Sequence, residues 1–229
     1  MNDLLAILIS FIYVFLILGA AEGLRRAFKL DADFTRKVVH IGVGMWAWGT
    51  AALFTNRWAA IVPPAAFVAI NYLSYRYGLF MAMESKDKSN LGTVYFPIAF
   101  VAAVLLFFDT KPFFVLTLMP LTWGDPFAAI VGRRFGRHHY TVLKSTRSLE
   151  GSFAMLILSF LSAWVTLTLF GSNPFNWAAL LIAAVVAALS TLVEAISPFG
   201  LDNLLIPAAS ALGAIATVSI LSAALPGVL

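Results

Sequence analysis

Long apolar runs follow one another along the chain, with short polar stretches between them. A helix needs about 20 residues to cross a bilayer, and the polar flanks of shorter runs can lie at the interface. The pattern therefore predicts an all-α integral membrane protein, a bundle of about eight transmembrane helices with short loops, in one domain over residues 1–229; seven or nine spans also fit. The predicted spans are Leu4–Ala21, Val39–Phe54, Trp58–Leu73, Val94–Phe108, Phe113–Val131, Ser152–Phe170, Trp177–Ile196 and Asn203–Leu225.

The composition supports this membrane class. Of the 229 residues, 61% are hydrophobic and 11% are charged, whereas soluble domains carry about 25% charged residues. The chain has no cysteine, which excludes disulfides and thiolate metal ligands. Its first residues, Met1-Asn2-Asp3, lack the positive charge of a signal peptide.

Lysine and arginine alternate between the predicted connections. The first five connections hold five, one, three, one and five of them, and the last two hold none. Because cytoplasmic loops are enriched in Lys and Arg, we expect the odd-numbered connections on the cytoplasmic side of a plasma membrane and both termini outside. These loops explain the pI of about 9.5, so we expect membrane lipids as partners and no nucleic acid.

Four polar clusters fall at odd-numbered connections, and the first is TRKVVHIGVG at 35–44. On a helix, His40 shares a face with Arg36 or Lys37. Taken alone, Arg36 and Lys37 fit interfacial cations whose side chains extend to the headgroups. His40 is different, because it lies one turn into an otherwise apolar helix.

The second cluster, ESKDKSNLGTVYFP at 84–97, contains the mixed charges of a solvated loop. Its Asn90 and Gly92 lie just before a span, where backbone N–H groups can bind an anion.

The third cluster begins with WGDPFAAIVGRRFGR at 123–137 and continues to Ser152. Asp125 followed by Pro126 is typical of a helix start, because Asp caps free N–H groups and Pro favours the first turn. We therefore expect Pro120 and Pro126 to break this span. A carboxylate at membrane depth costs about 3 kcal/mol, which favours a functional role for Asp125 over a cap alone.

Basic residues follow Asp125 closely, namely Arg133, Arg134, Arg137, Lys144 and Arg147. Carboxylates that bind Mg²⁺, combined with cations, form the usual site for phosphate groups. Each arginine taken singly is also explained by membrane topology.

The fourth cluster is STLVEAISPFGLDNLLIPAAS at 190–210. Glu194 lies near the end of a span with no basic residue in its own segment, so it needs a metal ion or a cation from another cluster. Pro198 and Gly200 predict a turn. Asp202 and Asn203 open the next span, where Asp202 can act as a helix cap.

These clusters resemble the CTP-dependent lipid kinases of the polyprenol kinase type, which include dolichol, phytol and farnesol kinases and the CTP-dependent diacylglycerol kinase. Arg147 stands where this family often has Lys, and Pro126 where Thr or Gly is common. The pieces that carry the resemblance, in the family's order, are RKVVH at 36–40, NLGTVYFP at 90–97, GDPFAAIVGRRFG at 124–136, SLEGS at 148–152, Glu194, and Asp202 with Asn203.

The resemblance implies transfer of the γ-phosphate of a nucleoside triphosphate, usually CTP, to the hydroxyl of a lipid alcohol, with Mg²⁺. The acceptor would be an isoprenoid alcohol such as phytol, farnesol, geranylgeraniol or a polyprenol, or diacylglycerol. Asp125 and Asp202 are then the expected Mg²⁺ ligands, with Glu194 as a further ligand or general base and His40 at the phosphates or the acceptor hydroxyl. The expected nucleotide-binding residues are Arg36, Lys37, Asn90, Gly92, Gly124, Arg133, Lys144, Arg147, Ser148, Glu150, Gly151 and Asn203, with Glu150 and Gly151 shaping a loop over the nucleotide.

Two other functions fit the same composition. A phosphatidate cytidylyltransferase-like enzyme would use the same metal and nucleotide, but the His-Gly-Gly…Asp-Arg…Asp signature associated with those enzymes is missing. An ion-coupled transporter would also place acids within the membrane. Against a transporter, the acids cluster near one membrane face and the sequence has no inverted repeat.

Overall fold

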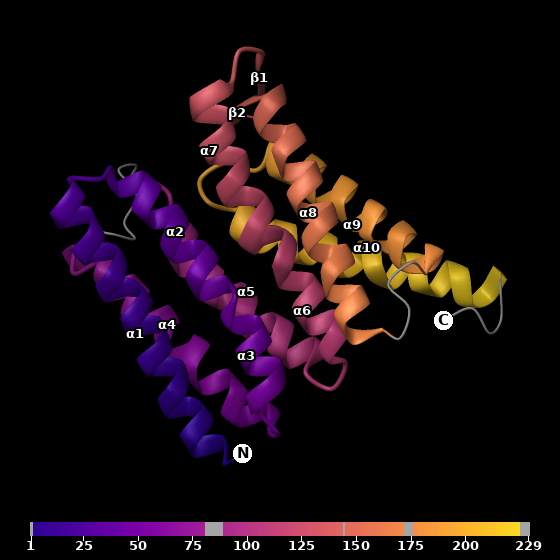
Figure 1. The fold of residues 1–229 in the computed structure, drawn as a ribbon, viewed down its shortest axis with the longest axis horizontal. Coiled ribbons are helices and arrows are strands. Elements are labelled where there is room, and N and C mark those ends of the chain that lie inside the picture. The colour runs from indigo at the N-terminus through magenta and orange to yellow at the C-terminus, as the bar shows by residue number, and fades with distance from the viewer. Residues whose placement is uncertain (1, 81–88, 144, 172–175, 225–229) are drawn as a thin grey trace. The chain divides into compact units, whose positions relative to one another are not determined.

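The computed structural model describes residues 2–80, 89–143, 145–171 and 176–224. Helices make up most of these residues, with one short antiparallel hairpin (Figure 1). In chain order the elements are α1 (Asp3–Phe28), α2 (Ala32–Gly44), α3 (Trp46–Leu53), α4 (Arg57–Tyr77), α5 (Gly92–Phe107), α6 (Lys111–Met119), the π-helical segment η1 (Pro120–Gly124), α7 (Asp125–Phe135), β1 (His139–Val142), β2 (Ser145–Ser148), α8 (Leu149–Phe170), α9 (Trp177–Ile196) and α10 (Asp202–Ala224).

The chain packs into two compact units, which we describe separately. The first contains Met1–Phe114 and Phe199–Leu204, and the second contains Val115–Pro198 and Leu205–Leu229. In the first unit α1 packs against α2 and α4, and α4 packs against α5; in the second, α8 packs against α7 and α9. The prediction of a single domain stays a prediction.

The class of all-α integral membrane protein is confirmed. Within the described residues, six helices are long and apolar enough to cross a membrane. The other two predicted spans are shorter helices: α5 has 16 residues, and the second predicted span is divided at Met45 between α2 and α3. The six long helices are Asp3–Phe28, Arg57–Tyr77, Lys111–Phe135, Leu149–Phe170, Trp177–Ile196 and Asp202–Ala224.

Polar side chains cap the starts of α1, α2, α4, α8 and α9. Each accepts a hydrogen bond from a backbone N–H of the first turn, which has no partner within the helix. Prolines lie inside α4, α5 and α10, as membrane helices tolerate when neighbouring groups satisfy the freed backbone. The capping residues are Asn2, Asp31, Asn56, Ser148 and Asn176.

The expected break at Pro120 and Pro126 takes the form of a change in helix type. The α-helix α6 ends at Met119 and α7 begins at Asp125, but the five-residue π-helical segment η1 joins them, so the backbone stays helical from Lys111 to Phe135. Thr122 helps here, because its hydroxyl donates to the carbonyl of Leu118 at 2.8 Å. Local π-helical geometry re-satisfies a backbone that proline interrupts, and such segments are frequent at functional sites.

The hairpin β1–β2 was not predicted from the sequence. Its register pairs His139 with Ser148 and Val142 with Ser145. Leu143, in the turn, has a positive φ of 46°. The hairpin connects α7 to α8 within the second unit.

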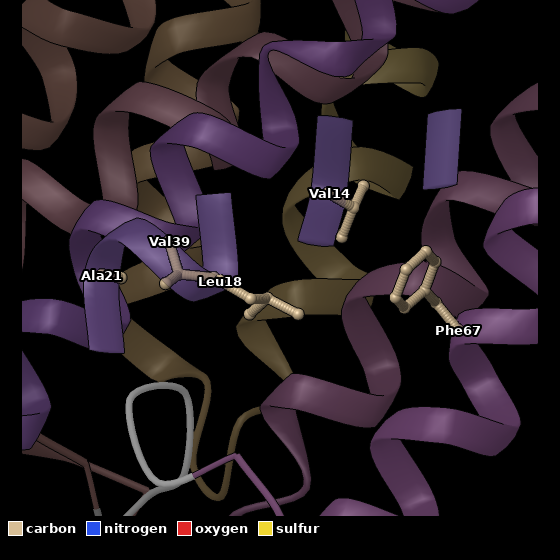
Figure 2. Packing of buried hydrophobic residues seen from close by; sticks show 5 residues of the cluster. All are labelled: Val14, Leu18, Ala21, Val39 and Phe67. Carbon is tan, nitrogen blue, oxygen red and sulfur yellow. The ribbon is translucent and has the colours of Figure 1, made fainter. Parts of the chain in front are cut away.

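A hydrophobic cluster joins three helices of the first unit (Figure 2). It contains Val14, Leu18 and Ala21 of α1, Val39 of α2 and Phe67 of α4. The Phe67 ring lies 5.6 Å from the ring of Phe11 and 5.7 Å from that of Phe15, centroid to centroid. Because lipid is as apolar as these side chains, the stabilisation comes from close packing.

We expect Phe67→Ala to lower the stability of the protein by about 2 kcal/mol or more, because it leaves a cavity against α1. In detergent this corresponds to a Tm lower by about 5 °C. The control is Trp58→Ala in the same helix, since Trp58 is 71% exposed. Equal Tm values for the two variants would contradict this packing.

Candidate functional site

Asp125 lies inside the second unit as a buried carboxylate. It is the first residue of α7 and 5% exposed. Its φ of −60° and ψ of −46° are helical, and α7 has no side-chain cap. Because η1 continues directly into α7, Asp125 does not start a free helix end, and the reading of Asp125 as a simple cap is wrong.

Small residues let α8 approach η1 and α7 closely. A Cβ added to Gly124 would lie 2.5 Å from the sulfur of Met155. A Cβ on Gly151 would lie 2.8 Å from the carbonyl oxygen of Ala128 and 3.3 Å from the Cα of Gly132. The glycines of the GDPF and SLEGS segments therefore set the distance between these helices.

Ser148 caps α8 at this contact. Its hydroxyl accepts a hydrogen bond from the N–H of Gly151 at 3.1 Å. Glu150 and Gly151 lie in the first turn of α8. Glu150 accepts hydrogen bonds from the His138 ring at 2.8 Å and from the His138 N–H at 3.4 Å, so it holds the base of the hairpin. Their expected role in shaping a loop over the nucleotide stays a prediction.

Glu194 has a cationic partner from another cluster, as its isolation in the sequence predicted. The Nε of Arg147 lies 2.6 Å from its Oε1. A guanidinium N–H of Arg147 also donates to the carbonyl of Ser197 at 3.2 Å. The Glu194 side chain is 5% exposed and that of Arg147 is 29% exposed, so this ion pair ties strand β2 to the end of α9.

The other basic residues of this cluster differ in their placement. Arg133, Arg134 and Arg137 are exposed, and the Arg134 guanidinium lies 5.7 Å from the centroid of the Phe135 ring. Lys144, a predicted phosphate-binding residue, lies outside the described residues.

In the first unit, α2 carries Arg36, Lys37 and His40 at the predicted helical spacing. Lys37 is buried, with 8% of its surface exposed. An interfacial lysine whose side chain extends to solvent would be more exposed. Arg36 pairs with Asp33 at 3.6 Å, and among the described residues its buried Nε has no hydrogen-bond partner. The His40 ring meets the Phe96 ring of α5 at 4.7 Å.

The start of α5 and the turn before α10 meet within the same unit. Gly200 has a φ of +83°, which favours glycine, and an added Cβ would lie 2.5 Å from the N of Gly92. The Nδ2 of Asn203 donates to the carbonyl of Gly200 at 3.2 Å and to Oδ1 of Asp202 at 2.8 Å. The NLG and DN segments, far apart in the sequence, therefore form one contact.

The Gly92 N–H donates to Oδ1 of Asn90 at 2.8 Å, so it has a partner within the protein. Anion binding by backbone N–H groups at Asn90 and Gly92 stays a prediction. The turn predicted at Gly200 and the helix start predicted at Asp202 are both confirmed.

Among the residues that the structure describes, no three His, Asp or Glu side chains gather as a closed metal site would require. Mg²⁺ keeps several waters and binds through one or two carboxylates plus phosphate oxygens. Asp125 and Asp202 are 5% and 9% exposed, and their oxygens fit such a hard cation. The assignment of the Mg²⁺ ligands to Asp125, Asp202 and Glu194 stays a prediction.

The fold and these residues define a membrane protein that buries carboxylates, at Asp125, Glu194 and Asp202, and the ammonium of Lys37 among apolar helices. Its sequence is 34% identical to the phytol kinase of Synechocystis sp., over 87% of this chain and 86% of that protein. It is 31% identical to a probable chloroplastic phytol kinase of Triticum aestivum, over 86% and 74%, and 27% identical to the chloroplastic farnesol kinase of Arabidopsis thaliana, over 93% and 74%.

The chain belongs to the phytol and polyprenol kinase family, and it is a lipid kinase. No family model matches the chain, and no solved structure matches it. These alignments cover between 86% and 93% of this chain.

Arg147→Met should destabilise the protein by about 3 kcal/mol, because it leaves the buried Glu194 carboxylate without its cation. The double variant Arg147→Met/Glu194→Gln removes both charges and should recover most of the lost Tm. If the double variant is as unstable as the single one, the two residues do not form a stabilising pair.

Gly200→Ala should lower the Tm through the strained backbone and the overlap with Gly92, at a cost of about 1–3 kcal/mol. Gly19→Ala is the matched control, since an added Cβ meets nothing within 4 Å and Ala favours a helix. A Gly200→Ala protein as stable as Gly19→Ala would refute the contact between the two segments.

Proposed function

We propose that this protein transfers the γ-phosphate of CTP to the hydroxyl of an isoprenoid alcohol such as phytol, farnesol or geranylgeraniol, in a Mg²⁺-dependent reaction. The observation that carries the proposal is the 34% identity to a phytol kinase across 87% of the chain. The buried carboxylates and cations support it, because phosphoryl transfer depends on positioning and on neutralising phosphate charge.

Carboxylates and cations have different roles in the proposed reaction. The alcohol oxygen bonds to the γ-phosphorus while the bond from that phosphorus to the β-phosphate oxygen breaks, so CDP leaves. The alcohol proton passes to a carboxylate, for which we propose Glu194. Asp125 and Asp202 would hold Mg²⁺, which neutralises phosphate charge when bound, and Arg36 and Lys37 would contact the phosphates.

The test combines purified protein with each nucleotide and each acceptor. γ-Labelled CTP or ATP is offered with phytol, farnesol, geranylgeraniol or diacylglycerol, with Mg²⁺ or with excess EDTA. We expect labelled isoprenoid phosphate from CTP, and none with EDTA. No labelled lipid from any combination would contradict the proposed function.

Asp125→Asn should reduce turnover by about 100-fold or more, because the amide removes a negative charge from the site. The control is Asp109→Asn, since the Asp109 side chain is 77% exposed and pairs with Arg57. Thermal stability is measured for both variants. Activity retained in a folded Asp125→Asn protein would remove Asp125 from the proposed metal site.

We also propose that the site faces the cytoplasm from a plasma membrane, because the basic connections are expected there. Because the sequence has no cysteine, a maleimide can label only a cysteine that is introduced by mutation. In intact cells, a membrane-impermeant maleimide should label Thr110→Cys and should reach Val142→Cys only after permeabilisation. The reverse pattern would invert the proposed topology.

A further inference from the structure

An apolar groove lies between α8 and α9 of the second unit. Its volume is about 390 Å³, within the usual range of ligand sites, about 300–1,000 Å³. No polar side chain lines it, and none of its lining residues belongs to the site described above. The lining residues are Leu156, Ile157, Phe160 and Leu161 of α8, with Ala184 and Ala187 of α9.

The α9 residues that line the groove lie on the helix face that also carries Glu194. Ala184, Ala187 and Glu194 share one helix face, because they are separated by three and seven residues. At 1.5 Å per residue, Ala187 lies about 10 Å from Glu194 along the axis. Thr191, between them, donates its hydroxyl hydrogen to the Ala187 carbonyl at 2.8 Å, so its polar group is satisfied within the helix.

The groove lies at a similar distance from the start of α8. Leu156 lies about 10 Å along the axis from Leu149, the first residue of α8. Arg147, the partner of Glu194, comes two residues before Leu149. Along α9 the groove therefore lies about 10 Å from Glu194, and along α8 it lies about 10 Å from the helix start that follows Arg147.

We propose that this groove holds the distal isoprene units of the acceptor alcohol, with the hydroxyl at the Arg147–Glu194 end; this inference rests on the proposed function. The walls of Leu, Ile and Phe and the floor of Ala give close packing to a branched hydrocarbon chain. The hydroxyl then lies toward Glu194, which is 3% exposed and is the proton acceptor of the proposed function. The first isoprene units fill the intervening distance, so only longer alcohols reach the groove.

The test fills the groove and compares acceptors of different length. Ala184 and Ala188 are both exposed on α9, but only Ala184 lines the groove. We expect Ala184→Phe to lower kcat/KM for geranylgeraniol, with four isoprene units, by about tenfold, because a displaced tail misaligns the hydroxyl. The value for geraniol, with two units, should stay within about twofold, and Ala188→Phe should change neither.

If Ala184→Phe lowers kcat/KM equally for both alcohols, or for neither, the proposal is overturned and the groove is assigned to bulk lipid. If the wild-type protein phosphorylates no isoprenoid alcohol, the proposed function itself fails. A second measurement does not depend on the variant or on turnover: a geranylgeraniol analogue with a terminal diazirine is crosslinked to wild-type protein. Labels on residues 156–161 or 184–187 support the groove, and labels confined to other segments exclude it.

Discussion

Charged groups within apolar surroundings must be compensated locally, and this constraint organises both units. A buried carboxylate or guanidinium costs several kcal/mol unless a partner of opposite charge or a set of hydrogen bonds stabilises it. Arg147 and Glu194 satisfy this need for each other. Their ion pair also fixes where the hairpin, α8 and α9 meet, so the polar end of the second unit depends on it.

A second constraint is the close approach of one backbone segment to another, which glycine permits because it has no side chain. In the second unit Gly151 lets α8 lie against Ala128 and Gly132 of α7. In the first unit Gly200 lets the turn before α10 touch the start of α5 at Gly92. Each contact holds polar residues of two distant segments at fixed positions, as a reaction that depends on alignment requires.

Hydrophobic patterning predicted the helical membrane fold, because runs of apolar residues admit few other structures in lipid. It missed the hairpin, since strands of four polar and β-branched residues give no comparable signal. It also placed a break at Pro120, where a π-helical segment accommodates the ring. The partner of Glu194 could be predicted as a cation from elsewhere, but not as Arg147, because that pairing exists only once α8 and α9 pack together.

We propose that the buried acids and cations serve the transfer of one phosphoryl group to a lipid hydroxyl. The most direct measurement compares CTP labelled at the α-phosphorus with CTP labelled at the γ-phosphorus, using geranylgeraniol as acceptor. We expect label in the lipid from the γ-position only, with CDP as the second product. Label from the α-position, with release of pyrophosphate, would contradict it.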